Sequence, residues 1–416
     1  MGSTLQSTFD LIVVGGGASG LMAAGRAAER GLSVLVLEKN KRVGEKLRIS
    51  GGGRCNITNA EPDERTLLSA YGKADQYLFS IFSQFSSTHT FTFFEKLGLP
   101  LVVQARQRAF PHSEKAEDVL KALEKYCKQG KVSIKTASPV IRVHAESGAV
   151  TGVTTPTGTY VAKNYIFATG GVSHPETGST GDGFKWLRDL AHSVHKPTPT
   201  IVPLATRESW SHDLAGVSLS FMKITFFVEG KRAFSIKGKV LFTHFGLSGP
   251  LILNASGKVD DLMHSGLVTA TIDAYPDTDL GALDRRITAV FDKNKNKSLK
   301  NVIKEIVPHG TGRGVLTLVG FDVEKKVHSI SKDERKALVR LLKALPITIT
   351  GLMGFDRAVV ADGGVPLDEI DMRTMRSKKI SNLFLTGDLL HITRPSGGYS
   401  LQLCWSTGYV AGSHVG

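Results

Sequence analysis

Three glycines and one acid near the start of the chain have the residue types and the spacing of a dinucleotide-binding site. Gly15, Gly17 and Gly20 form the pattern G-x-G-x-x-G, and Glu38 follows 18 residues after Gly20. The first glycine permits a tight turn, the second lets the backbone approach a pyrophosphate, and the third lets a helix pack closely on a strand. Glu38 would accept hydrogen bonds from the adenosine ribose and repel a 2′-phosphate, which disfavours NADP at this site.

The elements that this motif needs surround it in the sequence. Residues 11–14 are a short apolar run, which is typical of a buried parallel strand, and residues 33–37 form a second such strand. An alanine-rich segment between them favours a helix thin enough to lie close to the strands. This strand–helix–strand context favours a bound dinucleotide over a glycine-rich turn without a ligand. We expect three further residues to line the site: Ala18, Ser19 and Lys39.

A second glycine-rich loop follows soon after the acid, at residues 44–56, where NAD-binding units normally continue into helix and strand. A longer dinucleotide with a reactive ring needs extra backbone contact of this kind, so the loop favours FAD over NAD. Lys46 and Arg54 offer positive charge near its phosphates. The cofactor-contacting residues expected in this loop are Lys46, Ser50, Gly52, Gly53, Arg54, Cys55 and Asn56.

Two later apolar strands, at residues 165–168 and 383–386, end in turns suited to the same cofactor. The first turn is tight enough to approach a cofactor. The second carries an acid, Asp388, at the place where a carboxylate holds the ribityl hydroxyls in such sites. The expected contacts at these two strand ends are Ala168, Thr169, Gly170, Gly387 and Asp388.

The last helix begins in another glycine pair. Its first N–H groups could face the flavin N1–C2=O edge and stabilise the negative charge of reduced flavin. Arg394 could add to that effect or sit in solvent, and the sequence leaves both alternatives open. The residues expected to contact the cofactor here are Gly397, Gly398, Tyr399 and Ser400.

The middle of the chain has the pattern of antiparallel strands followed by helices. Residues 222–228 alternate apolar and polar side chains with a period of two, as a half-exposed strand does. Residues 278–345 are helical in pattern, and their clearest helix begins at a capping box of Ser331 and Glu334. Similar runs occur at residues 199–206, 233–243 and 266–273. Together with residues 222–228 they predict an antiparallel barrel or sandwich.

Five motifs spread over the chain resemble the signatures of one bacterial family. They are RISGGGRCNITN (48–59), RAFPHS (108–113), ATGGVSHPETGSTGDG (168–183), LFTHFGLSGP (241–250) and GDLLHITRPSGGYSLQLCWSTGYVAG (387–412). In this order they are similar to the NAD(P)/FAD-dependent oxidoreductases that include aminoacetone oxidase and the BaiN-type bile-acid ene-reductases. The chain departs from the family at Asp388, where a longer acid is common. It departs again at residues 391–394, where the family often has a more acidic stretch, and at Ser400, where Asn is common in the family.

The resemblance implies an α/β fold with a split, Rossmann-like FAD-binding domain. That domain would comprise residues 1–196 and 347–416. An antiparallel β-barrel-like substrate domain would occupy residues 197–277 and return near 346, and a helical subdomain would occupy residues 278–345.

Three residues are candidates for moving a proton or binding the substrate. The resemblance places His244 at the domain boundary near the flavin, and a histidine that is merely hydrogen-bonded in a turn is an equal alternative. Tyr399 and His391 are second candidates. For Tyr399 the alternative is a purely structural role, packed beneath the flavin ring. Cys55 fits a buried thiol better than a nucleophile, because no partner cysteine is nearby in sequence. The three cysteines include no C-x-x-C pair, so no metal site is expected.

The function predicted is that of an FAD-dependent oxidoreductase that transfers a hydride at flavin N5 to or from a small organic substrate. No second strand–GxGxxG–helix unit is evident, so any NAD(P)H that reduces the flavin would visit the substrate cleft as a transient donor. Equally, the substrate could reduce the flavin and oxygen could reoxidise it. Two other classes remain as alternatives, a flavoprotein that acts on RNA, as in tRNA modification, and a non-catalytic FAD-bound sensor.

Charge and composition bear on partners and location. The net charge is +14, and two basic runs, 292–300 and 325–343, fit solvated helical faces better than nucleic-acid binding because no aromatic residues interleave with the lysines. Nucleic acid is therefore not an expected partner. The apolar runs are of strand length, and the opening MGSTLQSTFD lacks the features of a signal peptide, so we expect a cytoplasmic protein without membrane spans. The oligomeric state is left open.

Overall fold

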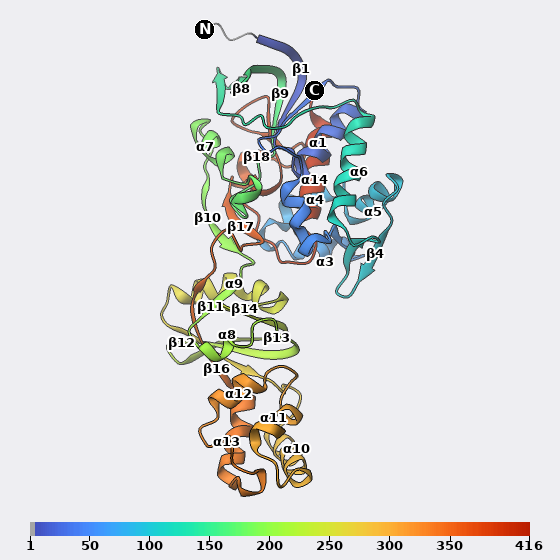
Figure 1. Cartoon of the computed structure of the whole chain (residues 1–416). Helices are drawn as coiled ribbons and strands as arrows, with labels where there is room; N and C mark the ends of the chain where they lie inside the picture. The colour runs from blue at the N-terminus through green and yellow to red at the C-terminus, as the bar shows by residue number, and fades with distance from the viewer. Residues whose placement is uncertain (1–4) are drawn as a thin grey trace. The chain divides into compact units, whose positions relative to one another are not determined.

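The computed structural model describes residues 5–416, which fall into two compact units (Figure 1). The first unit comprises the chain up to Pro199 together with Val359–Gly416, and the second unit comprises Thr200–Ala358. Residues 1–4 lie outside the described residues. They belong to the opening segment MGSTLQSTFD, on which the prediction of a cytoplasmic protein was partly based. Within residues 5–416 no helix is both long enough and apolar enough to cross a membrane.

A parallel sheet forms the centre of the first unit. Its strands, in order across the sheet, are β20 (Leu383–Leu385), β9 (Gly158–Phe167), β1 (Leu5–Val14), β2 (Val34–Leu37) and β6 (Ser133–Lys135). The last four residues of β1 are almost completely buried, as is typical of a central strand in a parallel sheet whose two faces are covered. The carboxyl ends of β1, β2, β9 and β20 therefore meet at one edge, and the α/β fold predicted from the sequence is confirmed.

Shorter antiparallel strands extend this sheet and form two small ones beside it. In the main sheet, the antiparallel strands are β7 (Arg142–Glu146), β8 (Ala149–Thr155), β18 (Ile370–Asp371) and β19 (Arg376–Ser377). A three-stranded sheet consists of β3 (Thr58–Asn59), β5 (Arg108–Pro111) and β4 (Leu101–Gln104). A two-stranded sheet consists of β10 (His195–Thr200) and β17 (Val360–Gly364), which joins segments far apart in the sequence.

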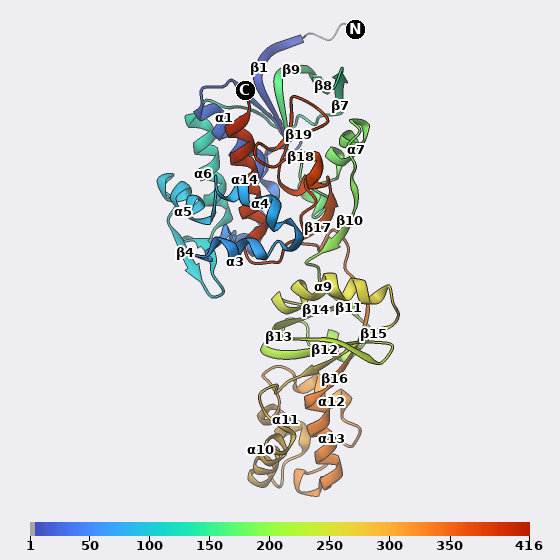
Figure 2. The same cartoon turned by 180° about the vertical axis from the view of Figure 1, so that it is seen from behind.

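Two helices pack closely together against the central sheet, α1 (Ala18–Glu29) and α14 (Tyr399–His414) (Figure 2). Glycines let them approach, because a Cβ on Gly408 would lie 2.4 Å from Ser19 O and one on Gly412 2.5 Å from Ala23 O. The other helices of this unit are α2 (Glu45–Ile49), α3 (Glu64–Ser69), α4 (Asp75–Phe82), α5 (Ser87–Lys96), α6 (Ala116–Gln129) and α7 (Asp182–Asp189).

The second unit is built on a closed antiparallel barrel, so of the two sequence alternatives the barrel is observed. Its strands, in order around the barrel, are β11 (Leu204–Thr206), β14 (Gly246–Ser248), β13 (Lys231–Thr243), β12 (Ser218–Val228), β15 (Val268–Asp273) and β16 (Leu345–Leu352). The domain boundary predicted at 346/347 is wrong, because it falls inside β16. Residues 347–358 belong to the barrel unit, where β16 pairs with both β15 and β11.

Helices complete the second unit and share one hydrophobic core with the barrel. The capping box predicted at Ser331 and Glu334 is confirmed, since Glu334 N donates to Ser331 Oγ (3.2 Å) and Ser331 N donates to Glu334 Oε2 (2.7 Å). The helices are α8 (Ser209–His212), α9 (Pro250–Met263), α10 (Leu280–Lys293), α11 (Leu299–Ile306), α12 (Gly312–Leu318) and α13 (Lys332–Lys343).

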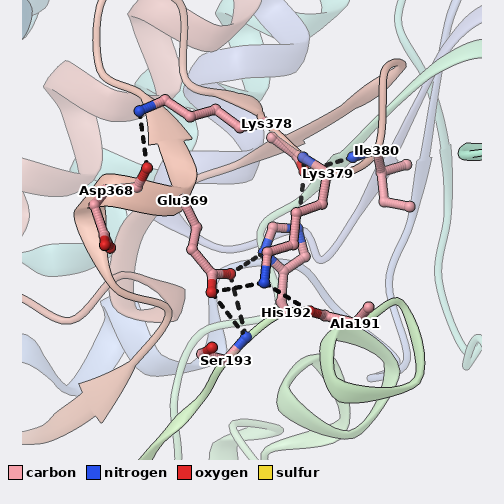
Figure 3. A network of polar contacts seen from close by, with 9 residues as sticks. Ala191, His192, Ser193, Asp368, Glu369, Lys378, Lys379 and Ile380 are labelled. Atoms are coloured by element: carbon pink, nitrogen blue, oxygen red, sulfur yellow. Dashed lines mark hydrogen bonds and ion pairs between the residues drawn. The ribbon is translucent and has the colours of Figure 1, made fainter.

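A buried polar network in the first unit fixes the segment that leads from α7 to β10 (Figure 3). His192 bonds through Nδ1 to Glu369 Oε2 (2.7 Å) and through Nε2 to Ser377 Oγ (2.8 Å). Glu369 also accepts from Lys379 Nζ (2.8 Å) and from Ser193 N (3.2 Å). Burial opposes ionisation of Glu369, but these donors outweigh it and lower its pKa to about 2. The network holds residues 191–193, and so the start of β10.

Replacing Glu369 by Gln is expected to lower the free energy of unfolding by about 2 kcal/mol, because charged hydrogen bonds to Lys379 and Ser193 are lost. The stabilisation is fully present above the ordinary pKa of 4.5 and is lost as the pH falls toward the folded value of about 2. The difference in urea unfolding between wild type and variant should therefore shrink below pH 4.5. The exposed Glu146→Gln serves as control, and a constant difference down to pH 3 would contradict the assignment.

Candidate functional site

The loop between β1 and α1 has the geometry that its glycines predicted. Gly15 has a φ of +106°, and a Cβ there would lie 2.5 Å from Ala168 O. A Cβ on Gly20 would lie 2.0 Å from Gly15 O, so only glycine lets the helix approach the turn. Next to Gly17, by contrast, no atom of the described residues beyond the adjoining backbone lies within 4 Å of the Cβ position. The backbone at Gly17 is thus open to a ligand, at a helix N-terminus where unpaired N–H groups favour an anion.

Glu38 lies at the end of β2, beside this loop, and is buried. Its Oε2 accepts from Gly16 N (2.7 Å) and its Oε1 accepts from Asn40 N (2.8 Å). Burial raises the pKa of the Glu38 carboxyl, and the two backbone N–H groups oppose that rise. The carboxylate therefore fixes the turn, and each oxygen keeps a lone pair that can accept from a ligand hydroxyl.

The glycine-rich loop after α2 is left-handed and open. Gly52 and Gly53 have φ values of +68° and +84°, and within residues 5–416 no atom outside the adjoining residues lies within 4 Å of either Cβ position. Cys55 follows with its side chain fully buried, and burial raises the pKa of its thiol to about 12. A thiol that stays protonated is a poor nucleophile, which agrees with the structural role preferred for it. Ser50 Oγ donates to Leu47 O (2.7 Å) within the chain.

Two polar residues of this loop bind other parts of the protein. Arg54 pairs with Glu114 (3.2 Å), and its guanidinium lies 4.4 Å from the centroid of the Phe110 ring. The Asn56 side chain, oriented to satisfy its neighbours, accepts from Gly398 N (2.9 Å) and joins the loop to the start of α14. A Cβ on Gly398 would lie 2.2 Å from the Thr58 carbonyl carbon, so only glycine permits this contact.

At the ends of β9 and β20 the turns also take left-handed backbone. Gly170 has a φ of +71° and Gly387 a φ of +63°. Thr169 lies so close to α7 that a Cβ on Gly183 would be 2.2 Å from its Oγ1. Ser19 is buried and accepts from Thr386 Oγ1 (3.1 Å), which ties α1 to the end of β20.

Lys39 joins the end of β2 to the loop at residues 178–182. Its Nζ donates to Thr180 Oγ1 (2.5 Å) and to Asp182 Oδ2 (2.8 Å), so the 178–182 loop lies against the residue after Glu38. A Cβ on Gly178 would lie 2.6 Å from Asn40 Nδ2. The loop thereby covers the end of β2.

Asp388 is held by two cations. Lys46 Nζ lies 3.2 Å from Asp388 Oδ2 and donates to Ser173 Oγ (2.5 Å), and Arg394 pairs with Asp388 Oδ1. Burial opposes ionisation of the carboxyl, but the charges of Arg394 and Lys46 outweigh it and lower the pKa of Asp388 to about 2. Of the two alternatives for Arg394, solvent is excluded: its side chain is 1% exposed, and Nε donates to Ser400 Oγ (3.0 Å).

A pair of histidines lies close to this turn. His391 follows it, and its ring packs against the ring of His195 of β10 with the centroids 4.5 Å apart and the planes tilted by 52°. Asp362 of β17 accepts from Thr393 Oγ1 (3.0 Å) through Oδ2. Its Oδ1 is buried and has no hydrogen-bond partner in the part of the chain that the structure describes. Burial, followed by the charge of His195, lowers the pKa of His391, and Asp362 opposes the fall.

The structure thus brings most predicted site residues to one edge of the first unit's sheet, on the loops after β1, β2, β9 and β20. Tyr399 lies at the start of α14, where its carbonyl accepts from Tyr71 OH (2.9 Å) and its ring meets the Tyr71 ring edge-on at 5.8 Å. His244 lies in the second unit, exposed in the turn between β13 and β14, and its role stays a prediction. His195 and Asp362 carried no motif that could have singled them out.

The open glycine backbones and the buried carboxylate at the sheet edge can hold a dinucleotide, and the comparisons agree with that geometry. The Rossmann-domain model of the HI0933-like proteins matches residues 9–414. The chain belongs to the HI0933-like family. The family resemblance predicted from the motifs is confirmed by this match.

Relatives match along almost the whole length. A 3-dehydro-bile acid delta(4,6)-reductase of Clostridium scindens is 28% identical over 96% of this chain and 97% of its own. Ribosomal RNA dihydrouridine synthases of Haemophilus influenzae and Escherichia coli are 27% and 26% identical, each over 96% of both chains. Among solved structures, a 3-ketosteroid-delta4-(5alpha)-dehydrogenase of Rhodococcus jostii is similar at a TM-score of 0.56 and 14% identity, over 99% of this chain and 97% of that one. This family and this fold are those of FAD-dependent oxidoreductases, the class predicted from the sequence.

Proposed function

We propose that the protein uses FAD to reduce a carbon–carbon double bond conjugated with a carbonyl group. The observation that carries the proposal is the sheet edge with its open Gly17 backbone and buried Glu38, in a chain of this family. The names of its full-length relatives narrow the reaction. A 3-dehydro bile acid with a delta-4 bond is an enone, and dihydrouridine is a uridine whose C5=C6 bond, conjugated with the C4 carbonyl, is saturated.

Several residues of the first unit would hold the cofactor. Gly17 and the first N–H groups of α1 would face the pyrophosphate, and Glu38 would accept from the adenosine ribose. The open backbone at Gly52 and Gly53 would lie along the remainder of the dinucleotide. Asp388, ionised between Lys46 and Arg394, would accept from ribityl hydroxyls. When bound and reduced, FAD would supply a hydride to the β-carbon of the substrate.

The α-carbon then needs a proton, and His391 is the group we assign to deliver it. His391 directly follows the Asp388 turn and is only half buried, so a substrate can reach its ring. The His195 ring packs against it at a tilt, and Asp362, whose buried Oδ1 has no partner within residues 5–416, attracts its protonated form. The hydride and the proton together saturate the double bond, and the two electrons come from the reduced flavin. His244 and Tyr399 remain alternative donors.

The electron donor we propose is NADH or NADPH, which would enter the substrate cleft in turn. Anaerobic mixing of the FAD-loaded protein with each nicotinamide should bleach the flavin band. Subsequent addition of a 3-oxo-delta-4 steroid, or of RNA that contains uridine, should restore the band and yield a product two mass units heavier. Bleaching without restoration by either substrate would contradict the proposed reaction, and bleaching by an amine or alcohol instead would indicate an oxidase.

A uridine in RNA is a second candidate substrate beside a small enone. Two relatives that match over the full length are named as acting on ribosomal RNA, and the chain carries a net charge of +14. A positive protein attracts polyphosphate chains, which favours this candidate although the sequence patterns alone did not.

A further inference from the structure

Two lysine-rich runs that are separate in the sequence lie side by side in the second unit. Leu299 N donates to Lys325 O (3.0 Å) and Val327 N donates to Lys297 O (3.0 Å), so the segments 295–300 and 323–328 run along each other. The His328 ring Nδ1 also donates to Lys295 O (2.6 Å). These bonds fix the backbone that carries the lysines, and they place the basic side chains of both segments on one part of the helical subdomain.

The lysines in this region differ in whether an acid neutralises them. Lys300 pairs with Glu324 (2.6 Å) and Lys325 pairs with Glu334 (2.9 Å). Four other lysines are exposed, and within residues 5–416 no carboxylate oxygen lies within 4.0 Å of their ammonium groups. We call these four the lysine patch: Lys293, Lys295, Lys297 and Lys326.

Charge in the second unit is concentrated around this patch. Residues 278–345 contain 15 Lys and Arg against eight Asp and Glu. The rest of the unit, residues 200–277 and 346–358, contains eight of each. The barrel is therefore neutral, and the helical subdomain, with fewer than one fifth of the residues, carries half of the chain's net charge of +14. A solvated helical face was expected for each run, but residues 294–297 form a turn, and backbone hydrogen bonds join the two segments.

We propose that the lysine patch binds the phosphates of a structured RNA, the substrate whose uridine the flavin site reduces. The inference rests on the proposed function and extends it by naming the substrate class and the surface that recognises it. No Phe, Tyr or Trp stands in either segment, so the contact is made to phosphates rather than by stacking on bases. RNA is preferred to an acidic protein because two full-length relatives are named for ribosomal RNA.

The test compares two quadruple variants that lose the same charge. The patch variant carries Lys293→Gln, Lys295→Gln, Lys297→Gln and Lys326→Gln. The control variant carries Lys73→Gln, Lys96→Gln, Lys128→Gln and Lys231→Gln, all exposed and outside the helical subdomain. Binding of fluorescently labelled bacterial ribosomal RNA is measured from about 50 to 200 mM salt, where each phosphate contact contributes roughly 0.7–0.9 to the log–log slope.

The patch variant is expected to bind at least about 10-fold more weakly than wild type at 100 mM salt, with a slope smaller by about 3, while the control variant stays within about 2-fold. Equal losses in the two variants, or no salt-dependent RNA binding by wild type, would overturn the patch. If the patch variant loses affinity for an acidic protein more strongly than it loses affinity for RNA, the surface would be assigned to a protein partner instead. Both variants should still bleach with nicotinamide and reduce a small enone, so failure of that reaction would count against the proposed function alone.

Discussion

Replacing Glu38 by Gln is expected to weaken FAD binding by about 100-fold. The carboxylate accepts from Gly16 N and Asn40 N through its two oxygens, at 2.7 and 2.8 Å. An amide has one acceptor oxygen, so its NH₂ group would face a backbone N–H and the turn would shift. The variant also loses the charged acceptor for the ribose. Together the two losses amount to about 3 kcal/mol of binding free energy, which corresponds to the expected 100-fold weaker binding of FAD. Titration of the apoprotein with FAD, followed by flavin fluorescence, measures the effect.

A suitable control for Glu38→Gln is Glu45→Gln, which removes an acid from the nearby helix α2. Glu45 pairs with Arg42 at the surface (3.1 Å), and within residues 5–416 its side chain makes no hydrogen bond or ion pair to the β1 turn. Its affinity for FAD should stay within about 2-fold of wild type, as surface pairs contribute little. Equal affinity of the Glu38 variant and wild type would show that the dinucleotide lies elsewhere.

Replacing His391 by Gln is expected to lower kcat for reduction of the double bond by about 100-fold or more, because a positioned proton donor typically contributes 10²–10⁴. The donor must carry the proton, and the pKa of His391 is lowered below its ordinary 6.5 by burial and by His195. The rate of wild type should therefore fall as the pH rises through that pKa. Stopped-flow reoxidation of reduced flavin by substrate measures this step apart from reduction by nicotinamide.

His195→Gln separates a proton donor from a residue that only packs. It removes the like charge whose ring lies 4.5 Å from that of His391 but leaves Asp362, so the pKa of His391 should rise. The falling limb of the pH–rate profile should then move to higher pH, with kcat at low pH nearly unchanged. A profile that does not move, or a His391 variant with the full rate, would assign the proton to Tyr399, His244 or solvent.

Local sequence was sufficient for the cofactor half of the fold. The roles expected of Gly15 and Gly20 agree with the close approaches in the structure, because a tight turn and the helix behind it are set by neighbouring residues. Three of the barrel strands, β12, β13 and β15, were expected from the runs at 222–228, 233–243 and 266–273, whereas β14 and β16 were not, and only residues 204–206 of the run 199–206 form a barrel strand. The boundary at 346/347 was misplaced because Leu345–Leu352 continues directly from the helical insertion, and only its pairing with β11 and β15 reveals a barrel strand.

The contacts between distant segments could not be obtained in this way. His195, Asp362 and His391 meet because β10 pairs with β17 and the chain then returns at the end of β20, which no motif encodes. The same holds for Arg394, whose burial against Asp388 excludes one of its two alternatives, a position in solvent. Each basic run was expected to be a solvated helical face, but residues 294–297 form a turn, and the bonds from Leu299 N to Lys325 O and from Val327 N to Lys297 O depend on the fold.

The most direct measurement is reoxidation of the flavin by substrate with oxygen excluded. The FAD-loaded protein is photoreduced without any nicotinamide, and a 3-oxo-delta-4 steroid or uridine-containing RNA is then added. We predict that the oxidised flavin band returns with one saturated double bond formed per flavin. A band that stays bleached with both substrates but returns on admission of oxygen would contradict the reduction of a conjugated double bond.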